Sequence, residues 1–321
     1  MQYKEIPYVT HKVSRMLYGT QPLPFANLAD PNRLLDTVFN DLGINTFDLA
    51  RVYPGAEALF GRWLLHRQQR DDVVILSKCG HPAPDGTKRV NEAEMRRDYA
   101  ESAEDLHTDY IDIYLLHRDD LNVPAGDIVE IFNAMHAEGK IGAFGGSNWT
   151  APRIAEANEY AYKHSLIPFT VTSPGFGLAR QIADPWGGGC TDISGPAHAD
   201  ERAWYKAQNM PVIAYAGLCH GFLSGKLKSD HIEQADEVLD RFARKGYLYP
   251  ENVERLRRCE EMAKKKGASV AQIAMAWIYH QDLNTFAVVS SCNETRMRQN
   301  TASLDIALTE EEISYLNNDT K

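Results

Sequence analysis

The sequence predicts one (β/α)8 (TIM) barrel, a closed ring of eight parallel strands that alternate with helices. Eight short β-rich runs recur along the 321 residues, and segments of helical periodicity lie between them. Strands that alternate with helices pair in parallel through right-handed crossovers, and eight such units close a barrel of one domain. A doubly wound sheet is the rival prediction, but no GxGxxG motif follows the first strand. We therefore expect a single domain over residues 1–321.

The predicted strands are short runs rich in β-branched, aromatic and small apolar residues. In chain order they are residues 16–19, 45–50, 73–79, 111–117, 143–148, 169–173, 211–217 and 285–291. The predicted helices have apolar residues at helical spacing. They span residues 32–42, 57–68, 91–107, 126–138, 151–164, 200–208, 252–281 and 293–303. Two capping-box patterns, Asn91 with Glu94 and Thr309 with Glu312, mark predicted helix starts.

Three further segments do not belong to the eight repeats. Residues 1–13 are expected to form a short strand pair over the closed end of the barrel, and residues 304–321 a closing helix. Residues 180–200 carry Pro, Gly and Asp in place of any periodicity, which predicts a long loop after the sixth strand. Such a loop would overhang the mouth of the barrel.

Composition and charge exclude several classes of partner. The 44 acidic residues outnumber the 34 basic residues, so the net charge of −10 repels nucleic acid and anionic lipid. The first residues have no apolar signal core, and no run approaches the roughly 18 apolar residues of a membrane span. We therefore expect a cytoplasmic protein without a membrane partner. The five cysteines lack CxxC spacing and the histidines lack HExxH spacing, which predicts free thiols and no metal site.

Polar residues stand at the ends of several predicted strands, where active sites of barrels are built. Four of them are an acid, a phenol, an amine and an imidazole, namely Asp48, Tyr53, Lys78 and His117. Taken singly, Asp48 and Lys78 suit a structural ion pair, and His117 suits a satisfied core histidine. Their coincidence at the ends of three neighbouring strands favours a shared chemical site.

The segments that carry these residues resemble the aldo-keto reductase family. GINTFDLARVYPGAEALFGRWL is similar to the family motif GxxxxDTAxxYGxxExxLG, VILSKC to a strand that ends in lysine, and DYIDIYLLHRDD to DxxDLYxxHxPD. The similarity runs from KVSRMLYGT to LTEEEISYL. It implies an NAD(P)H-dependent oxidoreductase (EC 1.1.1.-) that reduces the aldehyde or ketone group of a small molecule to an alcohol. The alternative is a non-catalytic member of the fold, a cofactor-sensing regulatory or scaffold subunit.

The resemblance implies that Asp48, Tyr53, Lys78 and His117 form a catalytic tetrad. Carbonyl reduction delivers a hydride to carbon and a proton to oxygen, so a weak acid must stand beside the reacting oxygen. Tyr53 is that acid in the family pattern, and the ammonium of Lys78 is expected to lower the pKa of its phenol. Asp48 would neutralise Lys78, while His117 would donate a hydrogen bond that orients the carbonyl.

The same resemblance implies an extended NAD(P)H site along the mouth. Ser147 and Asn148 are expected to hydrogen-bond the nicotinamide carboxamide, and Tyr215 to stack on its ring. Without the resemblance, the first two suit a strand-to-helix turn and Tyr215 a core aromatic. Residues 218–226 resemble the pyrophosphate loop, where glycines let the backbone approach phosphate. The other expected contacts in this part of the site are Gly19, Thr20, Asp48, Ala216, Leu218, Gly221, Leu223, Gly225 and Lys226.

The adenosine end departs from the family pattern. Arg296 stands where an arginine contacts the 2′-phosphate and Asn300 where an asparagine faces adenine, near a helix start that favours an anion. Ser290 replaces the basic residue of many NADP-preferring members, so half of the phosphate clamp is present. NADPH is therefore favoured, and NADH is left open. The expected set is completed by Ser173, where many members have a glutamine, and by Ser291 and Asn293.

Two tryptophans, Trp149 and Trp186, are candidates to line a substrate pocket beside Tyr53 and His117. Trp149 starts a helix, so packing against the barrel rim is its alternative. Trp186 lies in the long loop before three glycines, which suits a lid that closes over cofactor or substrate. Prolines at both flanks of the loop suit a static decoration equally well. Neither the substrate nor the oligomeric state follows from the sequence.

Overall fold

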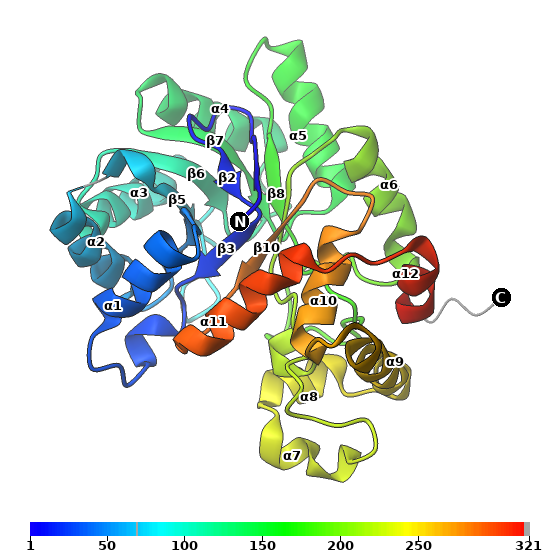
Figure 1. Ribbon diagram of the computed structural model, residues 1–321. Helices are drawn as coiled ribbons and strands as arrows, with labels where there is room; N and C mark the ends of the chain where they lie inside the picture. Colours follow the sequence, from blue (N-terminus) through cyan, green and yellow to red (C-terminus); the bar gives the residue numbers. More distant parts are fainter. Residues whose placement is uncertain (69, 318–321) are drawn as a thin grey trace.

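The structure is a closed barrel of eight parallel strands, which confirms the predicted fold class (Figure 1). It is a computed structural model that describes residues 1–68 and 70–317. The strands follow the order β10-β3-β4-β5-β6-β7-β8-β9, and β9 pairs with β10 to close the ring. Neighbours in the barrel are thus consecutive along the chain, as repeated right-handed βα units require.

Each barrel strand overlaps its predicted run. The strands are β3 Met16–Gly19, β4 Thr46–Asp48, β5 Val74–Cys79, β6 Ile111–Leu116, β7 Ile141–Ser147, β8 Val171–Ser173, β9 Val212–Ala214 and β10 Thr285–Val289. Their side chains alternate between two apolar clusters because a strand has a period of two. The inner cluster contains Leu17, Val74, Leu76, Ile113, Leu115, Ala143, Val171, Ile213 and Phe286. The other cluster packs the outer side of the strands against the helices.

The helices surround the barrel, and most of them match a predicted segment (Figure 1). They are α1 Pro31–Asp36, α2 Ala56–Arg67, α3 Glu92–Leu106, α4 Ala125–Ala137, α5 Ala151–Lys163, α6 Ala199–Ala207, α9 Pro250–Lys266, α10 Val270–Tyr279, α11 Glu294–Thr301 and α12 Glu310–Asn317. Both halves of the capping box form between Thr309 and Glu312. At α3 only half forms, because Asn91 accepts from the backbone of Glu94 while the Glu94 carboxylate binds Arg89.

The continuous helix predicted over residues 252–281 is wrong, because the structure has two helices there. Gly267 ends α9 in the left-handed region, with φ of 63°, which a residue without Cβ adopts readily. Ser269 and Gln272 then form a capping box that starts α10. The helix predicted over residues 32–42 also changes character, since α1 passes into a π-helical turn at Thr37–Asp41.

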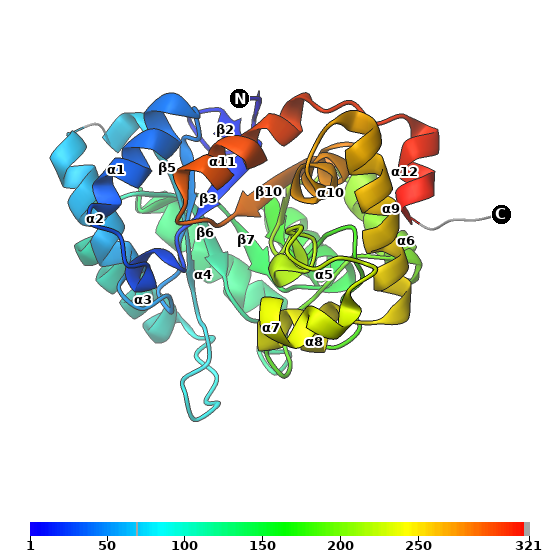
Figure 2. The ribbon, with the colours of Figure 1, turned by 60° about the horizontal axis from the view of Figure 1, so that its bottom comes forward.

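Two short helices after β9 were not predicted. Helix α7 spans Ala235–Val238 and α8 spans Arg241–Tyr247, and both are too short to show helical periodicity. They lie at the opposite side of the barrel from the N-terminus (Figure 2). The loop predicted over residues 180–200 is confirmed, since this segment stays irregular up to a 3-10 turn at Pro196–His198 and the start of α6.

The N-terminal segment covers the closed end of the barrel, as predicted. Strands β1 Tyr3–Lys4 and β2 Val13–Ser14 form an antiparallel pair, and Ile6 between them joins the inner cluster. The predicted closing helix is represented by α12, while residues 318–321 lie outside the described residues. Within the described part of the chain, every helix is too short or too polar to cross a membrane.

Candidate active site

The side chains of the predicted tetrad follow the inward-facing positions of neighbouring strands. Leu76 on β5 faces the barrel interior, and Lys78 lies two residues further on. In the same way, His117 lies two residues beyond Leu115 of β6. Apolar side chains fill the barrel below, so the polar groups gather at its mouth.

A buried ion pair joins β4 and β5 at the mouth. The Nζ atom of Lys78 lies 2.5 Å from Oδ1 of Asp48 and donates a second hydrogen bond, of 2.8 Å, to the carbonyl oxygen of Leu49. Burial lowers the pKa of Lys78, but the carboxylate of Asp48 and the phenol of Tyr53 outweigh burial and raise this pKa above its usual value. Lys78 therefore stays cationic at neutral pH.

Tyr53 lies in the loop between β4 and α2, and its ring faces both Lys78 and His117. The Nζ atom of Lys78 is 5.1 Å from the centre of this ring, and the ring centre of His117 is 5.9 Å away. Burial raises the pKa of the Tyr53 phenol, while the charge of Lys78 opposes this rise without cancelling it. The lowering expected from Lys78 is thus one of two opposing effects, and the phenol keeps its proton at neutral pH.

His117 is a buried, neutral imidazole at the end of β6. Burial lowers its pKa well below 6.5, and the charges of Lys78 and Arg118 lower it further. Its backbone N–H donates to the carbonyl oxygen of Cys79 at 2.7 Å, which fixes it across to β5. Its Nδ1 atom is buried and has no hydrogen-bond partner among the residues that the structure describes. A neutral imidazole carries one N–H, which it can donate to an oxygen.

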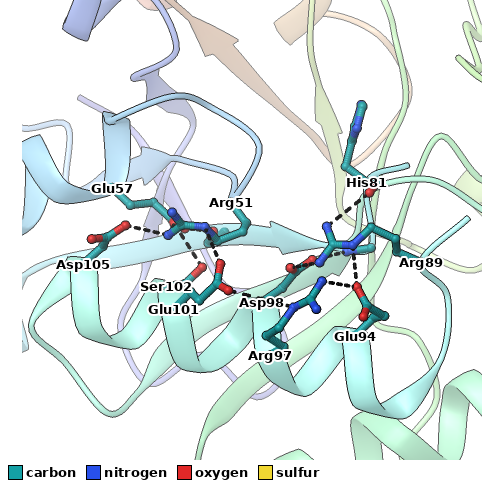
Figure 3. A network of polar contacts seen from close by, with 12 residues as sticks. Arg51, Glu57, His81, Arg89, Glu94, Arg97, Asp98, Glu101, Ser102 and Asp105 are labelled. Carbon is teal, nitrogen blue, oxygen red and sulfur yellow. Dashed lines mark hydrogen bonds and ion pairs between the residues drawn. The ribbon is translucent and has the colours of Figure 1, made fainter. Parts of the chain in front are cut away.

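A polar network behind the mouth holds the Tyr53 loop against β5 (Figure 3). Arg51 and Glu57 flank this loop and form an ion pair of 2.7 Å. The buried carboxylate of Glu57 also accepts a hydrogen bond of 2.6 Å from Ser77, the neighbour of Lys78 on β5. The network therefore fixes the position of the phenol relative to the ammonium.

Asn148 connects the strand ends on the other side of the mouth. Its Nδ2 atom donates to the carbonyl oxygen of His117 at 3.1 Å. Its Oδ1 atom accepts from the Tyr215 hydroxyl at 2.6 Å and from the backbone N–H of Thr191 at 3.2 Å. One side chain thus links β6, β9 and the loop of residues 180–200.

The two candidate tryptophans lie in different surroundings. Trp149 is fully buried, with its ring centre 5.1 Å from that of Phe169, because Gly146 on β7 leaves room for the indole. This packing favours the alternative of rim packing, and the assignment of Trp149 to the substrate pocket stays a prediction. Trp186 is 40% exposed, and its ring centre lies 4.7 Å from that of His220.

Two further residues of the mouth, His81 and Arg118, were not predicted. The ring centres of His81 and His117 are 5.0 Å apart, and Arg89 approaches the backbone carbonyl of His81 (Figure 3). Arg118 directly follows His117. Both lie just past the ends of strands that carry tetrad residues, and this position is the signal that could have identified them.

Comparison with known proteins identifies the family to which this site belongs. The model of the Aldo/keto reductase family matches residues 15–318. The chain belongs to this family. The resemblance inferred from the sequence is thereby confirmed, and all four tetrad positions lie within the matched region.

Relatives of this aldo/keto reductase are similar along most of their length. An uncharacterized oxidoreductase, YrpG, of Bacillus subtilis (strain 168) is 25% identical over 99% of this chain and 95% of its own. L-glyceraldehyde 3-phosphate reductase of Escherichia coli O157:H7 is 26% identical over 86% of this chain and 80% of its own. A probable voltage-gated potassium channel subunit beta of Oryza sativa subsp. japonica is 26% identical over 95% of this chain and 92% of its own. The relatives therefore include named oxidoreductases and a named channel subunit.

Several predicted cofactor residues of the aldo/keto reductase lie at the strand ends. Gly19 is so close to Ser290 that a Cβ at Gly19 would overlap the Ser290 hydroxyl. Thr20 donates a hydrogen bond of 2.9 Å to the carbonyl oxygen of Asp48. On the other side of the mouth, the hydroxyl of Ser147 donates to the carbonyl oxygen of Ser173 at 3.0 Å. Both hydroxyls thus donate to backbone carbonyls at the ends of neighbouring strands.

Residues 216–226 form a tight turn beyond β9. Gly221 and Gly225 have φ of 91° and 83°, a region that favours glycine, and Ala216 has φ of 54°. The carbonyl oxygen of Leu218 accepts from the backbone N–H groups of Gly221 and Leu223, at 2.9 Å and 3.2 Å. Glycine suits the backbone at these two positions, and the close approach of a phosphate to them stays a prediction.

The predicted phosphate-binding residues Lys226 and Arg296 are exposed. Neither forms an ion pair with any residue in the described ranges. Asn293 caps α11 by accepting from the backbone N–H of Arg296 at 2.9 Å, whereas Asn300 is buried and Ser291 accepts from Tyr18 through its carbonyl oxygen. Each of these two cations is thus exposed and available to an anion.

Proposed function

We propose that this protein is an NAD(P)H-dependent reductase that converts the aldehyde or ketone group of a small molecule to an alcohol. The observation that supports this best is the buried ion pair of Lys78 and Asp48 beside the Tyr53 phenol, with the neutral imidazole of His117 next to the same phenol. The bound cofactor would supply the hydride. The proposal includes a cytoplasmic location and no nucleic-acid partner.

In this proposal Tyr53 gives its proton to the carbonyl oxygen. Its raised pKa keeps the proton in place before the reaction. When the proton leaves, the cation of Lys78 stabilises the phenolate electrostatically, because the two groups share a site with little water. Asp48 holds Lys78 in position and balances its charge.

His117 would orient the substrate. Because burial keeps its imidazole neutral, it can donate an N–H to the carbonyl oxygen without competing with Tyr53 as the acid. The hydrogen bond from Asn148 to the backbone of His117 keeps the ring at the mouth.

The exposed cations Lys226 and Arg296 suit the phosphates of a dinucleotide, and Arg296 favours NADPH over NADH. Arg296→Ala is expected to weaken NADPH binding by about 1.5 to 3 kcal/mol, the scale of a charge-assisted hydrogen bond, and to leave NADH binding unchanged. Fluorescence titration of both cofactors measures this. Arg298→Ala is the control, because Arg298 lies on the same helix as Arg296 and its charge is already paired with Asp41. Equal losses for both cofactors would mean that Arg296 only supports α11.

A non-catalytic, cofactor-sensing role is the second candidate, because one relative is named as a probable potassium channel subunit beta. The assembled ion pair, phenol and imidazole favour catalysis over sensing. The absorbance of the reduced nicotinamide, followed with a panel of aldehydes, ketones and sugars, separates the two. A sensor would bind cofactor and turn over none of them.

The role of Tyr53 is tested by Tyr53→Phe. This variant is expected to bind the cofactor normally and to lower kcat by about 100-fold or more, because it lacks the general acid. Tyr162→Phe removes an exposed hydroxyl of α5 and serves as the control. If Tyr53→Phe retained the kcat of the wild type, another group would have to donate the proton.

A further inference from the structure

The mouth of the barrel holds a cation that the tetrad does not use, Arg118. It follows His117 directly and is partly buried. Its side chain lies against the loop of residues 180–200, since a Cβ built on Gly189 would be 3.7 Å from Cδ and 4.0 Å from Nε of Arg118. Gly189 has φ of 78°, so the loop passes over Arg118 at a position that favours glycine.

The charge of Arg118 acts on both this loop and the reacting groups. On the tetrad side its charge lowers the pKa of Tyr53 and of His117. On the loop side it acts on Cys190, whose pKa burial raises and Arg118 lowers. The cation is therefore close to the place where a carbonyl would be reduced.

Arg118 has no carboxylate partner among the described residues. The carboxylates on the segments that flank it have other partners. Asp119 forms an ion pair of 3.1 Å with Arg153. The carboxylate of Asp184 accepts the backbone N–H groups of Trp186 and Cys190, at 2.8 Å and 3.0 Å. Lys78 differs in this respect, because Asp48 balances its charge.

We propose that Arg118 binds an oxyanion of the substrate, so that the substrate class is a short aldehyde or ketone that carries a carboxylate or a phosphate. A cation that is partly removed from water and lacks a counter-charge is stabilised by an anion. The planar guanidinium matches both oxyanions with two parallel hydrogen bonds. Because Arg118 directly follows His117 and its charge acts on Tyr53, we expect the oxyanion and the carbonyl to belong to one small substrate. The inference rests on the proposed reductase function.

Pairs of substrates that share an aldehyde group and differ in an anionic group separate the effect of the negative charge from the effect of the carbonyl. The pairs are butanal with 4-oxobutanoate and glyceraldehyde with glyceraldehyde 3-phosphate. We expect the wild type to prefer the anionic member of at least one pair by about 10-fold or more in kcat/KM. The pair that shows the preference distinguishes carboxylate from phosphate. No preference in either pair would overturn the proposal.

Variants of Arg118 locate the preference. Arg118→Met is expected to raise KM for the anionic substrate by about 10- to 100-fold and to leave KM for the neutral partner within about 2-fold of the wild type, because the neutral substrate has no oxyanion. Arg118→Lys keeps the positive charge but cannot donate two parallel hydrogen bonds. Its KM for the anionic substrate should therefore lie between those of the wild type and Arg118→Met. Arg180→Met, which removes a cation already paired with Glu251 at 2.7 Å, is the control. Equal losses for neutral and anionic substrates would overturn the proposal and assign Arg118 to the acidity of Tyr53.

Binding without turnover keeps this test independent of the proposed function. Calorimetric titration uses butanoate and propylphosphonate, which have no reducible carbonyl, with butanamide as the neutral control. NADP+ is present throughout to occupy the cofactor site. Binding of one anion by the wild type but not by Arg118→Met supports the subsite even if no aldehyde is reduced. If neither anion binds, the subsite is overturned, whether or not neutral aldehydes are reduced.

Discussion

The roles proposed for Tyr53 and His117 predict a pH range for carbonyl reduction. Burial lowers the pKa of His117, so this imidazole is already neutral at pH 6.5, and burial raises the pKa of Tyr53, so this phenol is still protonated at pH 10. We therefore expect kcat/KM for carbonyl reduction to stay level from about pH 6.5 to about pH 9 and to fall only at higher pH. Stopped-flow rates across this range measure it. A loss of activity centred below about pH 9 would show that Lys78 outweighs burial in the free enzyme.

At the scale of single residues, the sequence predicts which side chains could carry the chemistry better than it predicts which residues contact one another. The structure brings Asp48, Tyr53, Lys78 and His117 together, and this could be predicted because each stands at a strand end or in the loop that follows it. Arg118 stands there too, but its significance depends on the approach of Gly189 from a loop whose path has no sequence signature. The burial of Trp149 could not be predicted, because the space for its indole is created by Gly146 on the preceding strand.

Among the elements, the strands and most of the longer helices were predicted, and the shortest helices were not. The eight strands could be recognised because each is an apolar run between turn residues. Helices α7 and α8 were missed because four and seven residues carry too little periodicity. The boundary between α9 and α10 depends on Gly267, and a single glycine inside an apolar period does not by itself predict a break.

The packing of α2 on α3 depends on one glycine. A Cβ at Gly61 would overlap the carbonyl oxygen of Asp105, at the end of α3. Alanine is normally better than glycine in a helix, yet we expect Gly61→Ala to lower the free energy of unfolding by about 1 to 3 kcal/mol, because overpacking outweighs propensity. Urea denaturation measures it, with Ala100→Gly, at an exposed position of α3, giving the propensity effect alone. Stabilisation by Gly61→Ala would contradict the close contact.

At the scale of the whole molecule, stability and chemistry lie at opposite ends of the barrel. Ile6 covers the closed end and is 2% exposed, while the tetrad lies at the mouth. Ile6→Ala is expected to lower the free energy of unfolding by about 2 to 4 kcal/mol through the cavity it leaves, and to change kcat by less than about 2-fold. Denaturation and steady-state kinetics of the same sample check both. Glu5 is exposed and directly precedes Ile6, so Glu5→Ala should change neither the free energy of unfolding nor kcat.

The attachment of the long loop has a consequence for engineering new selectivity. Its entry is fixed where the N–H of Ile182 meets the carbonyl of Gly246, and its exit where Thr191 bonds to Asn148 and to Gly175. The stretch between these fixed points supplies none of the groups assigned to proton transfer. We therefore expect residues 183–190 to be replaceable as one segment. Libraries of variants confined to this segment can be screened for new substrates without changing the residues of the tetrad.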